Sequence, residues 1–226
     1  GWGPCICDEP EMMDAGHTLQ SGTDAGLSDA KVAKVYAEAT FETEVTYDVV
    51  YAQGLTAESW EDDDTSVMDL MLDVYEPVGH ESLQKPVVVV VHGGGFVSGS
   101  TTQNQIVAFC EHYAERGWVA FSVDYRVVGD YGSKPDWWAE GFEPIGGMAE
   151  DQAQATYAAG RDAKAAIRWI RANAETYGVH SDYIGVIGGS AGAFITVMIG
   201  TANEEDYKEE LTVEEDPTLS STHLEQ

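Results

Sequence analysis

Ser190 lies in the run Gly188-Gly189-Ser190-Ala191-Gly192. A serine hydroxyl becomes an accessible nucleophile where a strand turns sharply into a helix, and the backbone there approaches so closely that only glycine fits on either side. The run therefore predicts Ser190 as a nucleophile, with Gly188 and Gly192 permitting the turn. A helix beginning at Ala191 would point its N–H groups toward an attacked carbonyl, so Ala191 is a candidate oxyanion donor.

A second glycine run follows a continuous run of valines at residues 87–91 and reads His92-Gly93-Gly94-Gly95-Phe96. Glycines after a buried strand let backbone N–H groups face an oxyanion without obstruction by a Cβ atom. The serine pattern alone would arise by chance at roughly the ten per cent level in a chain of this length. Together, the two runs predict loops that converge on one site.

Strands and helices must alternate along the chain to position these loops. Alternating or continuous apolar residues predict strands, and apolar residues at helical spacing predict helices. The predicted strands cover about residues 45–51, 68–75, 87–91, 118–123 and 183–187. The predicted helices cover about residues 28–39, 104–116 and 153–177, with another from 191. This order predicts an α/β fold with a mostly parallel sheet and helices on both faces.

Further motifs surround the two loops. Leu-Asp-Val-Tyr-Glu-Pro occupies residues 72–77, Asp-Tyr-Arg occupies 124–126 and Arg-Asp-Ala occupies 161–163. With these motifs, residues 45–200 resemble the carboxylesterase and lipase families of the α/β-hydrolase superfamily, especially those similar to hormone-sensitive lipase and type-B carboxylesterases. The resemblance implies an α/β-hydrolase fold and a serine hydrolase that cleaves carboxylic esters.

The resemblance also implies roles for individual residues. Ser190 would be acylated, and Gly94 and Gly95 would supply oxyanion amides together with Ala191. His92 would brace the loop that includes Gly93 and would not act as the base. Gly189 stands where many relatives carry an acidic residue and Ala193 replaces a frequent third glycine. The resemblance therefore does not predict the acyl and alcohol groups of the substrate, and amide, thioester and lactone substrates remain alternatives.

The catalytic base is the weakest part of the sequence prediction. In the resembled fold the chain order is serine, then acid, then histidine, and only 226 − 190 = 36 residues follow Ser190. His223 is the one histidine among them, with Asp206 and Asp216 as candidate acids. Only five strands are predicted, where the resembled fold has eight. The favoured interpretation is an N-terminal portion of a longer enzyme, with little turnover by itself; an inactive fragment and a silent hydrolase-like binding module are the alternatives.

The predicted organisation has three parts. Residues 1–44 form an N-terminal arm and helix, residues 45–202 the α/β-hydrolase core, and residues 203–226 an acidic polar tail or the start of a missing C-terminal part. Phe96, Trp137 and Trp138 are candidates for a substrate pocket, and ordinary packing is the alternative for these aromatic side chains.

Composition excludes several partners. The chain has 226 residues, with 40 Asp and Glu against 11 Lys and Arg and a formal charge of -29. Such a charge repels nucleic acid and anionic membranes. No apolar run is long enough to span a bilayer, and the acidity favours a secreted protein. No nucleotide, flavin or metal motif is present, and the close pair Cys5 and Cys7 lacks partners for a metal site, so no cofactor is expected. Oligomeric state is not predicted.

Four of the basic residues recur at helical spacing. Such a stripe is typical of a solvated helix face that pairs with nearby carboxylates, and a docking stripe is the alternative. The sequence favours the solvated face. The residues are Arg161, Lys164, Arg168 and Arg171.

Overall fold

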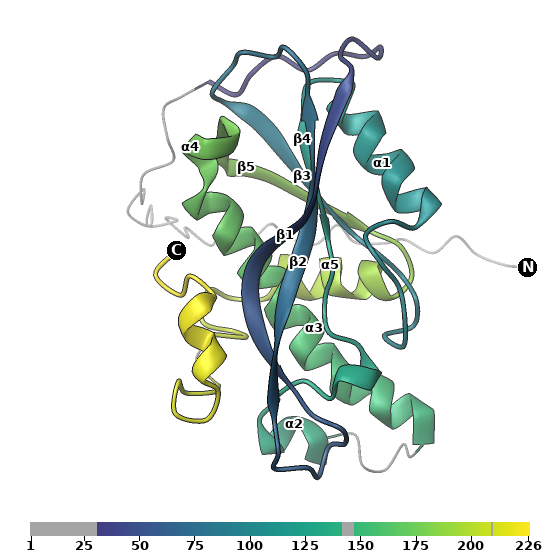
Figure 1. Ribbon diagram of the computed structural model, residues 1–226, viewed down its shortest axis with the longest axis vertical. Helices are drawn as coiled ribbons and strands as arrows, with labels where there is room; N and C mark the ends of the chain where they lie inside the picture. Colours follow the sequence, from purple (N-terminus) through teal and green to yellow (C-terminus); the bar gives the residue numbers. More distant parts are fainter. Residues whose placement is uncertain (1–30, 142–146, 209) are drawn as a thin grey trace, which may run out of the picture.

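The structure, a computed structural model, describes residues 31–141, 147–208 and 210–226. The described residues form one five-stranded sheet in the order β1-β2-β4-β3-β5 (Figure 1). Its strands are β1 (Thr43–Thr56), β2 (Ser66–Pro77), β3 (Lys85–Val91), β4 (Val119–Val123) and β5 (Val179–Gly188). β3 pairs in parallel with β4 and β5, and only β2 runs against the other strands. The predicted mostly parallel sheet is confirmed.

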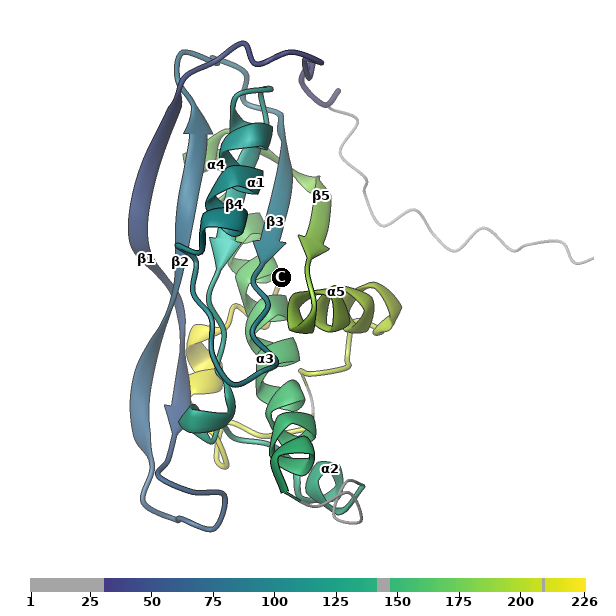
Figure 2. The same cartoon turned by 90° about the vertical axis from the view of Figure 1, so that its right-hand side faces the viewer.

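The valines of β3 lie at the centre of the molecule. All seven residues of β3 are buried, as expected for a parallel strand covered on both faces. Val87, Val89 and Val91 pack into the larger core cluster with α3 (Gly147–Ala172), and Val88 and Val90 pack into the smaller one with α1 (Asn104–Ala114). Figure 2 shows α1 and α3 against different sides of the sheet. Helices on both faces are thereby confirmed.

The remaining helical elements lie around the sheet. They are η1 (Val128–Asp130), α2 (Asp136–Glu140), α4 (Ala174–Tyr177), α5 (Ala191–Thr201) and η2 (Pro217–Ser221). The helix predicted over 153–177 is divided by the structure into α3, which begins earlier, and α4. α5 directs Ile195 into the larger core cluster. None of the helices in the described ranges is long and apolar enough to cross a bilayer.

The predicted helix around residues 28–39 is wrong over its described part, because residues 31–42 contain no helix. Their backbone N–H groups bond to other loops: Ala33 donates to the carbonyl of Gln84, and Tyr36 to that of Arg116. These tertiary hydrogen bonds replace the ladder that a helix would need, and the short apolar pattern does not outweigh them. The residues before 31, including Ser28, Cys5 and Cys7, lie outside the described part of the chain.

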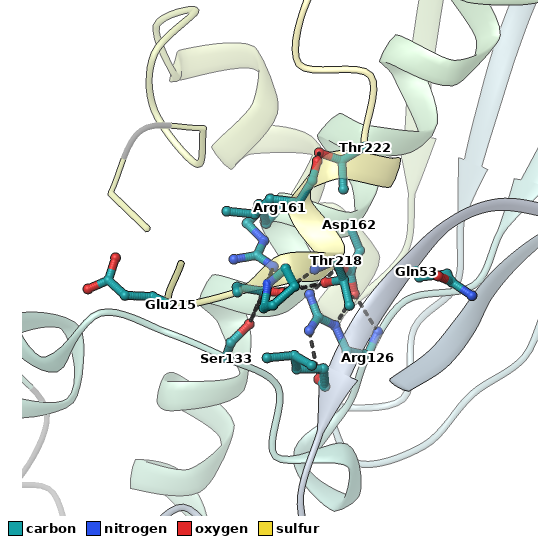
Figure 3. A network of polar contacts seen from close by, with 12 residues as sticks. Gln53, Arg126, Ser133, Arg161, Asp162, Glu215, Thr218 and Thr222 are labelled. Atoms are coloured by element: carbon teal, nitrogen blue, oxygen red, sulfur yellow. Dashed lines mark hydrogen bonds and ion pairs between the residues drawn. The ribbon is translucent and has the colours of Figure 1, made fainter. Parts of the chain in front are cut away.

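The C-terminal segment, predicted as an acidic polar tail or the start of a missing C-terminal part, packs against α3. Asp216, Thr218 and Leu219 are buried, and the ion pair Arg161–Asp216 ties the segment to α3. Figure 3 shows Arg161 of α3 close to Thr218 of this segment. Ser133 donates its hydroxyl hydrogen to Asp216, with 2.6 Å between Oγ and Oδ2. On the same helix, Asp162 forms a second buried ion pair with Arg126 of the chain after β4, at 2.6 Å. Two buried ion pairs therefore lie on adjacent residues of α3.

The basic stripe of α3 is also corrected by the structure. Arg161 and Arg168 are 2% and 5% exposed, so half of the stripe is buried beneath the C-terminal segment. Arg168 donates from Nε to the carbonyl of Thr222 at 2.8 Å. The predicted pairing with carboxylates holds for Arg161, but the predicted solvated face does not hold for either arginine.

The buried pair predicts a pH dependence of stability. Burial would raise the pKa of Asp216, but the charge of Arg161 and the hydroxyls of Ser133 and Thr218 outweigh burial and lower this pKa. A carboxyl with a lowered pKa stabilises the fold above its unfolded pKa, about 3.9 for Asp, and loses that contribution as pH falls through the folded value. We expect the stability difference between the protein and Asp216→Asn to stay constant from about pH 7 to 5 and to shrink below about pH 4. Denaturant unfolding across this range measures it, and an unchanged difference at about pH 3 contradicts the expectation.

Candidate active site

Ser190 occupies the turn between β5 and α5, as the sequence predicts. Its backbone has φ 54 and ψ -120, a region that residues other than glycine rarely adopt. Such strain persists only where the surrounding structure enforces it, and it clusters at functional sites. Ser190 is also exposed, so its hydroxyl is held on the outside of the turn where another molecule can reach it.

The flanking glycines are required by close backbone approach. A Cβ atom on Gly188 would lie 2.4 Å from the carbonyl carbon of Gly192, and one on Gly192 would lie 2.2 Å from the carbonyl oxygen of Val91. Both distances are far below any real contact, and both neighbours are backbone atoms that cannot move aside. Nothing lies within 4 Å of a Cβ placed on Gly189. The turn therefore needs glycine at positions 188 and 192 but tolerates a side chain at 189.

This contrast gives a matched pair of variants. We expect Gly192→Ala to lower the free energy of unfolding by about 3 kcal/mol, because the added methyl group must displace the end of β3. Gly189→Ala makes the same chemical change at the residue before the serine, where the added methyl group meets open space. Its free energy of unfolding should stay within about 0.5 kcal/mol of the parental value. Denaturant unfolding of both variants measures the difference. Equal stabilities would show that the turn is not packed against Val91 in this way.

The glycine loop after β3 lies directly against the turn. A Cβ atom on Gly93 would meet the carbonyl oxygen of Gly189 at 2.8 Å and Cβ of Ser190 at 3.3 Å. Gly94 and Gly95 follow with φ values of 131 and 64, which glycine adopts without steric cost. A Cβ on Gly94 would also collide with the carbonyl of Ser98. The two predicted loops are thus brought together in space.

Three backbone N–H groups at this meeting point have no hydrogen-bond partner among the described residues. They belong to Gly94, Gly95 and Ala191, and no side chain accepts from them. Gly94 is exposed and Gly95 half-buried, so these donors are open to a bound molecule. Ala191 N–H also stands at the N-terminus of α5, where the helix dipole favours negative charge. An arrangement of this kind can bind an anion or a developing oxyanion.

His92 lies beneath the glycine loop and is fully buried. Its Nδ1 is 2.8 Å from the carbonyl oxygen of Gly93, and its Nε2 is 2.9 Å from Oδ1 of Asp124. The ring stacks on Tyr125 with 4.2 Å between centroids, and the Tyr125 hydroxyl donates to the carbonyl of His92 at 2.9 Å. Both ring nitrogens therefore have partners within the protein, and His92 does not line the pocket that contains Ser190.

A pocket of about 300 Å³ opens in front of Ser190. Phe96, predicted from the sequence, forms part of its wall. Phe194 of α5 and Thr156 of α3 form other parts of the wall, which the sequence did not predict. Phe194 could have been found, because it lies one helical turn after the serine. The residues lining the pocket are Gly95, Phe96, Gln152, Ala153, Thr156, Ser190, Ala191 and Phe194.

The two tryptophans considered for this pocket do not line it. Trp137 is 55% exposed. Trp138 packs against Tyr157, with 5.4 Å between ring centroids, and donates from Nε1 to the carbonyl of Ala153 at 3.1 Å. Trp138 therefore has the ordinary packing role that was the alternative to a pocket role, because its indole N–H donates to a carbonyl of α3 and its ring packs against a side chain of that helix.

His223 and its candidate acids are not brought to Ser190. His223 Nδ1 lies 3.5 Å from Oε1 of Glu225, and no histidine lines the serine pocket. Asp216 is engaged in its buried pair with Arg161, and Asp206 accepts a hydrogen bond from the backbone of Asn203. The described residues thus assemble a serine and amide donors but place no histidine beside them. They also contain no group of three His, Cys, Asp or Glu that could hold a metal ion.

The chain is similar to known esterases over part of its length. The BD-FAE family model matches residues 72–134 and 149–224. Esterase LipC of Mycobacterium tuberculosis is 30% identical over 152 residues, which cover 67% of this chain and 32% of that protein. Gut esterase 1 of Caenorhabditis elegans is 32% identical over 126 residues, covering 55% of this chain and 19% of that protein.

A solved esterase structure is similar as well. Esterase 2 of Thermogutta terrifontis, phosphorylated by paraoxon, has 30% sequence identity and a TM-score of 0.49; the match covers 80% of this chain and 54% of that one. The chain therefore spans about a third or less of the two curated relatives and about half of the solved structure.

Proposed function

The chain belongs to the BD-FAE family and has five strands of an α/β-hydrolase sheet, and from this premise we propose that it carries the nucleophile and oxyanion half of a serine esterase. One observation carries the proposal above all. Ser190, in a strained turn, adjoins unpaired amide donors from two separate loops. The curated relatives LipC and gut esterase 1 are named esterases, which supports the same chemistry.

In the proposed reaction, Ser190 Oγ attacks the carbonyl carbon of an ester and a tetrahedral intermediate forms. Its oxyanion accepts hydrogen bonds from the amides of Gly94, Gly95 and Ala191, whose positions are set before the substrate arrives. Collapse expels the alcohol and leaves the acyl group on Ser190, and water then releases the acid. A base must take the serine proton, and the proposal assigns this step to none of the described residues because no histidine lines the pocket.

The pocket indicates where the acyl group would lie. Phe96 and Phe194 supply aromatic walls, and Ala153 adds an apolar surface. A volume of about 300 Å³ lies at the lower end of the range for small-molecule sites. We therefore propose small esters with an apolar acyl group as substrates.

A silent binding module of the same fold is the competing function. Such a module has no need of a strained serine or of unpaired amides at the same point, because function is added to a fold by its site. A fluorophosphonate probe separates the two possibilities, since it labels an activated serine whatever the natural substrate. We expect labelling of the full-length protein at Ser190, located by peptide mass spectrometry. Labelling that Ser190→Ala leaves unchanged, or no labelling of the full-length protein, would overturn the esterase proposal.

A further inference from the structure

Gln152 links helix α3 to the glycine loop and to the serine pocket at once. Its Nε2–H donates to the carbonyl oxygen of Gly95, with 2.7 Å between Nε2 and oxygen. The same side chain lines the pocket beside Ser190. A Cβ atom on Gly95 would lie 3.2 Å from Gln152 Nε2, so the amide packs tightly over a position that has no side chain.

This contact acts on a glycine of the loop, whose backbone can rotate at little cost. Gly95 has φ 64, and glycine can leave such a conformation at little steric cost. The peptide before it is held because the Gly94 carbonyl accepts from the N–H groups of Val97 and Ser98, at 3.1 and 3.2 Å. The Gly95 carbonyl belongs to the peptide after it, and Gln152 is the hydrogen-bond donor that holds this carbonyl among the described residues.

We propose that Gln152 is a positioning residue. It holds the peptide plane after Gly95, while the plane before Gly95 is held through the Gly94 carbonyl, so that Gly95 cannot rotate and its amide stays directed at Ser190. The inference rests on the proposed esterase function and adds to it a residue on α3, a different element from either loop. Preorganised donors stabilise an oxyanion because they need no reorientation during the reaction. The contribution of Gln152 is to keep that preorganisation.

The type of side chain matters as much as its reach. A glutamine amide donates a hydrogen bond at every pH, whereas an ionised glutamate can only accept. A glutamate at position 152 would face the Gly95 carbonyl with two acceptors and no hydrogen between them. Protonation of that glutamate would supply an O–H donor and restore the contact. Gln152→Glu is therefore a variant whose defect should depend on pH.

The experiment measures ester hydrolysis by the full-length protein and its Gln152→Ala and Gln152→Glu variants. Loss of one direct oxyanion donor costs about 10²- to 10³-fold in kcat, and Gln152 acts one step behind the donors. We expect Gln152→Ala to lower kcat roughly tenfold with KM changed less than about twofold, because the contact matters in the transition state. We expect Gln152→Glu to lose more at neutral pH and to recover toward the parent as pH falls.

Gln154→Ala is the matched control, because it makes the same change on the same helix. Gln154 donates to Oε1 of Glu150 at 3.1 Å and does not line the pocket. Equal kcat values for Gln152→Ala and Gln154→Ala, with no pH-dependent recovery of Gln152→Glu, would overturn the positioning role while Ser190-dependent activity persists. Activity that survives in Ser190→Ala would instead overturn the proposed function itself. If Gln152→Ala does not fold, the pH profile of Gln152→Glu, which keeps the side-chain length, decides the question.

Discussion

Replacing Ser190 by alanine is expected to lower kcat/KM for a small ester by at least about 10⁴-fold in the full-length protein. The reason is that the variant keeps the pocket and the amide donors but has no atom that can form the acyl-enzyme. Residual catalysis by an oxyanion site and by binding alone leaves roughly 10³- to 10⁴-fold over water when a catalytic triad is disabled. The variant should therefore retain a small rate above background. Steady-state hydrolysis of a chromogenic ester measures both rates.

A second serine provides the control for this experiment. Ser220 is exposed on η2, and its hydroxyl donates to the carbonyl of Pro217 at 2.8 Å. Ser220→Ala should keep the parental rate. Ser190→Ala should also keep the parental free energy of unfolding within about 0.5 kcal/mol, because Ser190 is exposed and its hydroxyl has no hydrogen-bond partner in the described part of the chain. A Ser190→Ala variant that retains more than a tenth of the activity would be incompatible with an acyl-enzyme on Ser190.

Replacing Asp216 by alanine is expected to lower the free energy of unfolding by about 3–5 kcal/mol. Arg161 is 2% exposed and Asp216 fully buried, so the variant leaves a guanidinium in the interior without its counterion. One nitrogen of Arg161, Nη1, already has no hydrogen-bond partner among the described residues. Asp216 also accepts hydrogen bonds from Ser133 and Thr218, and both hydroxyls lose this partner. Denaturant unfolding at neutral pH measures the loss.

A variant that removes both charges tests whether the loss of stability comes from the unpaired charge of Arg161 or from any change in this segment. Arg161→Met with Asp216→Leu replaces two charges by apolar side chains of similar volume, and such replacements are often neutral or stabilising. The double variant should recover most of the stability that Asp216→Ala loses. Glu214→Ala, an exposed acidic residue nearby, should change the free energy of unfolding by less than about 0.5 kcal/mol. A loss for Asp216→Ala as small as that for Glu214→Ala would mean that the pair is not buried.

The features that the sequence predicted well depend on short stretches of chain. The valines of residues 87–91 predict a fully buried strand because both faces of that strand are covered, and the structure confirms this. The two glycine runs predict sharp loops because close backbone approach excludes Cβ atoms, as Gly188 and Gly192 demonstrate. In each case the residues that carry the signal are contiguous in the sequence, although the backbone that excludes a Cβ at Gly192 belongs to Val91.

The features that the sequence did not predict depend on contacts between distant positions. Gln152 is an ordinary helix residue until the fold places it 2.7 Å from the Gly95 carbonyl, 57 residues away. Arg161 belonged to a stripe that the local pattern assigned to solvent, and its partner Asp216 follows 55 residues later. The apolar residues after position 31 have helical spacing, but tertiary hydrogen bonds to Gln84 and Arg116 determine their conformation.

Strand β5 forms an edge of the sheet at which separate copies of this chain can meet. Among the described residues β5 pairs with β3 alone, so one row of its backbone groups has no strand partner there. Phe194 and Val197 of α5 are 67% and 62% exposed. An unpaired edge of this kind is a template for strands from other molecules. The formal charge of -29 opposes such encounters at low ionic strength, but salt shortens the reach of this repulsion to about 8 Å at 0.15 M. We therefore expect association of separate copies through this edge to increase with ionic strength.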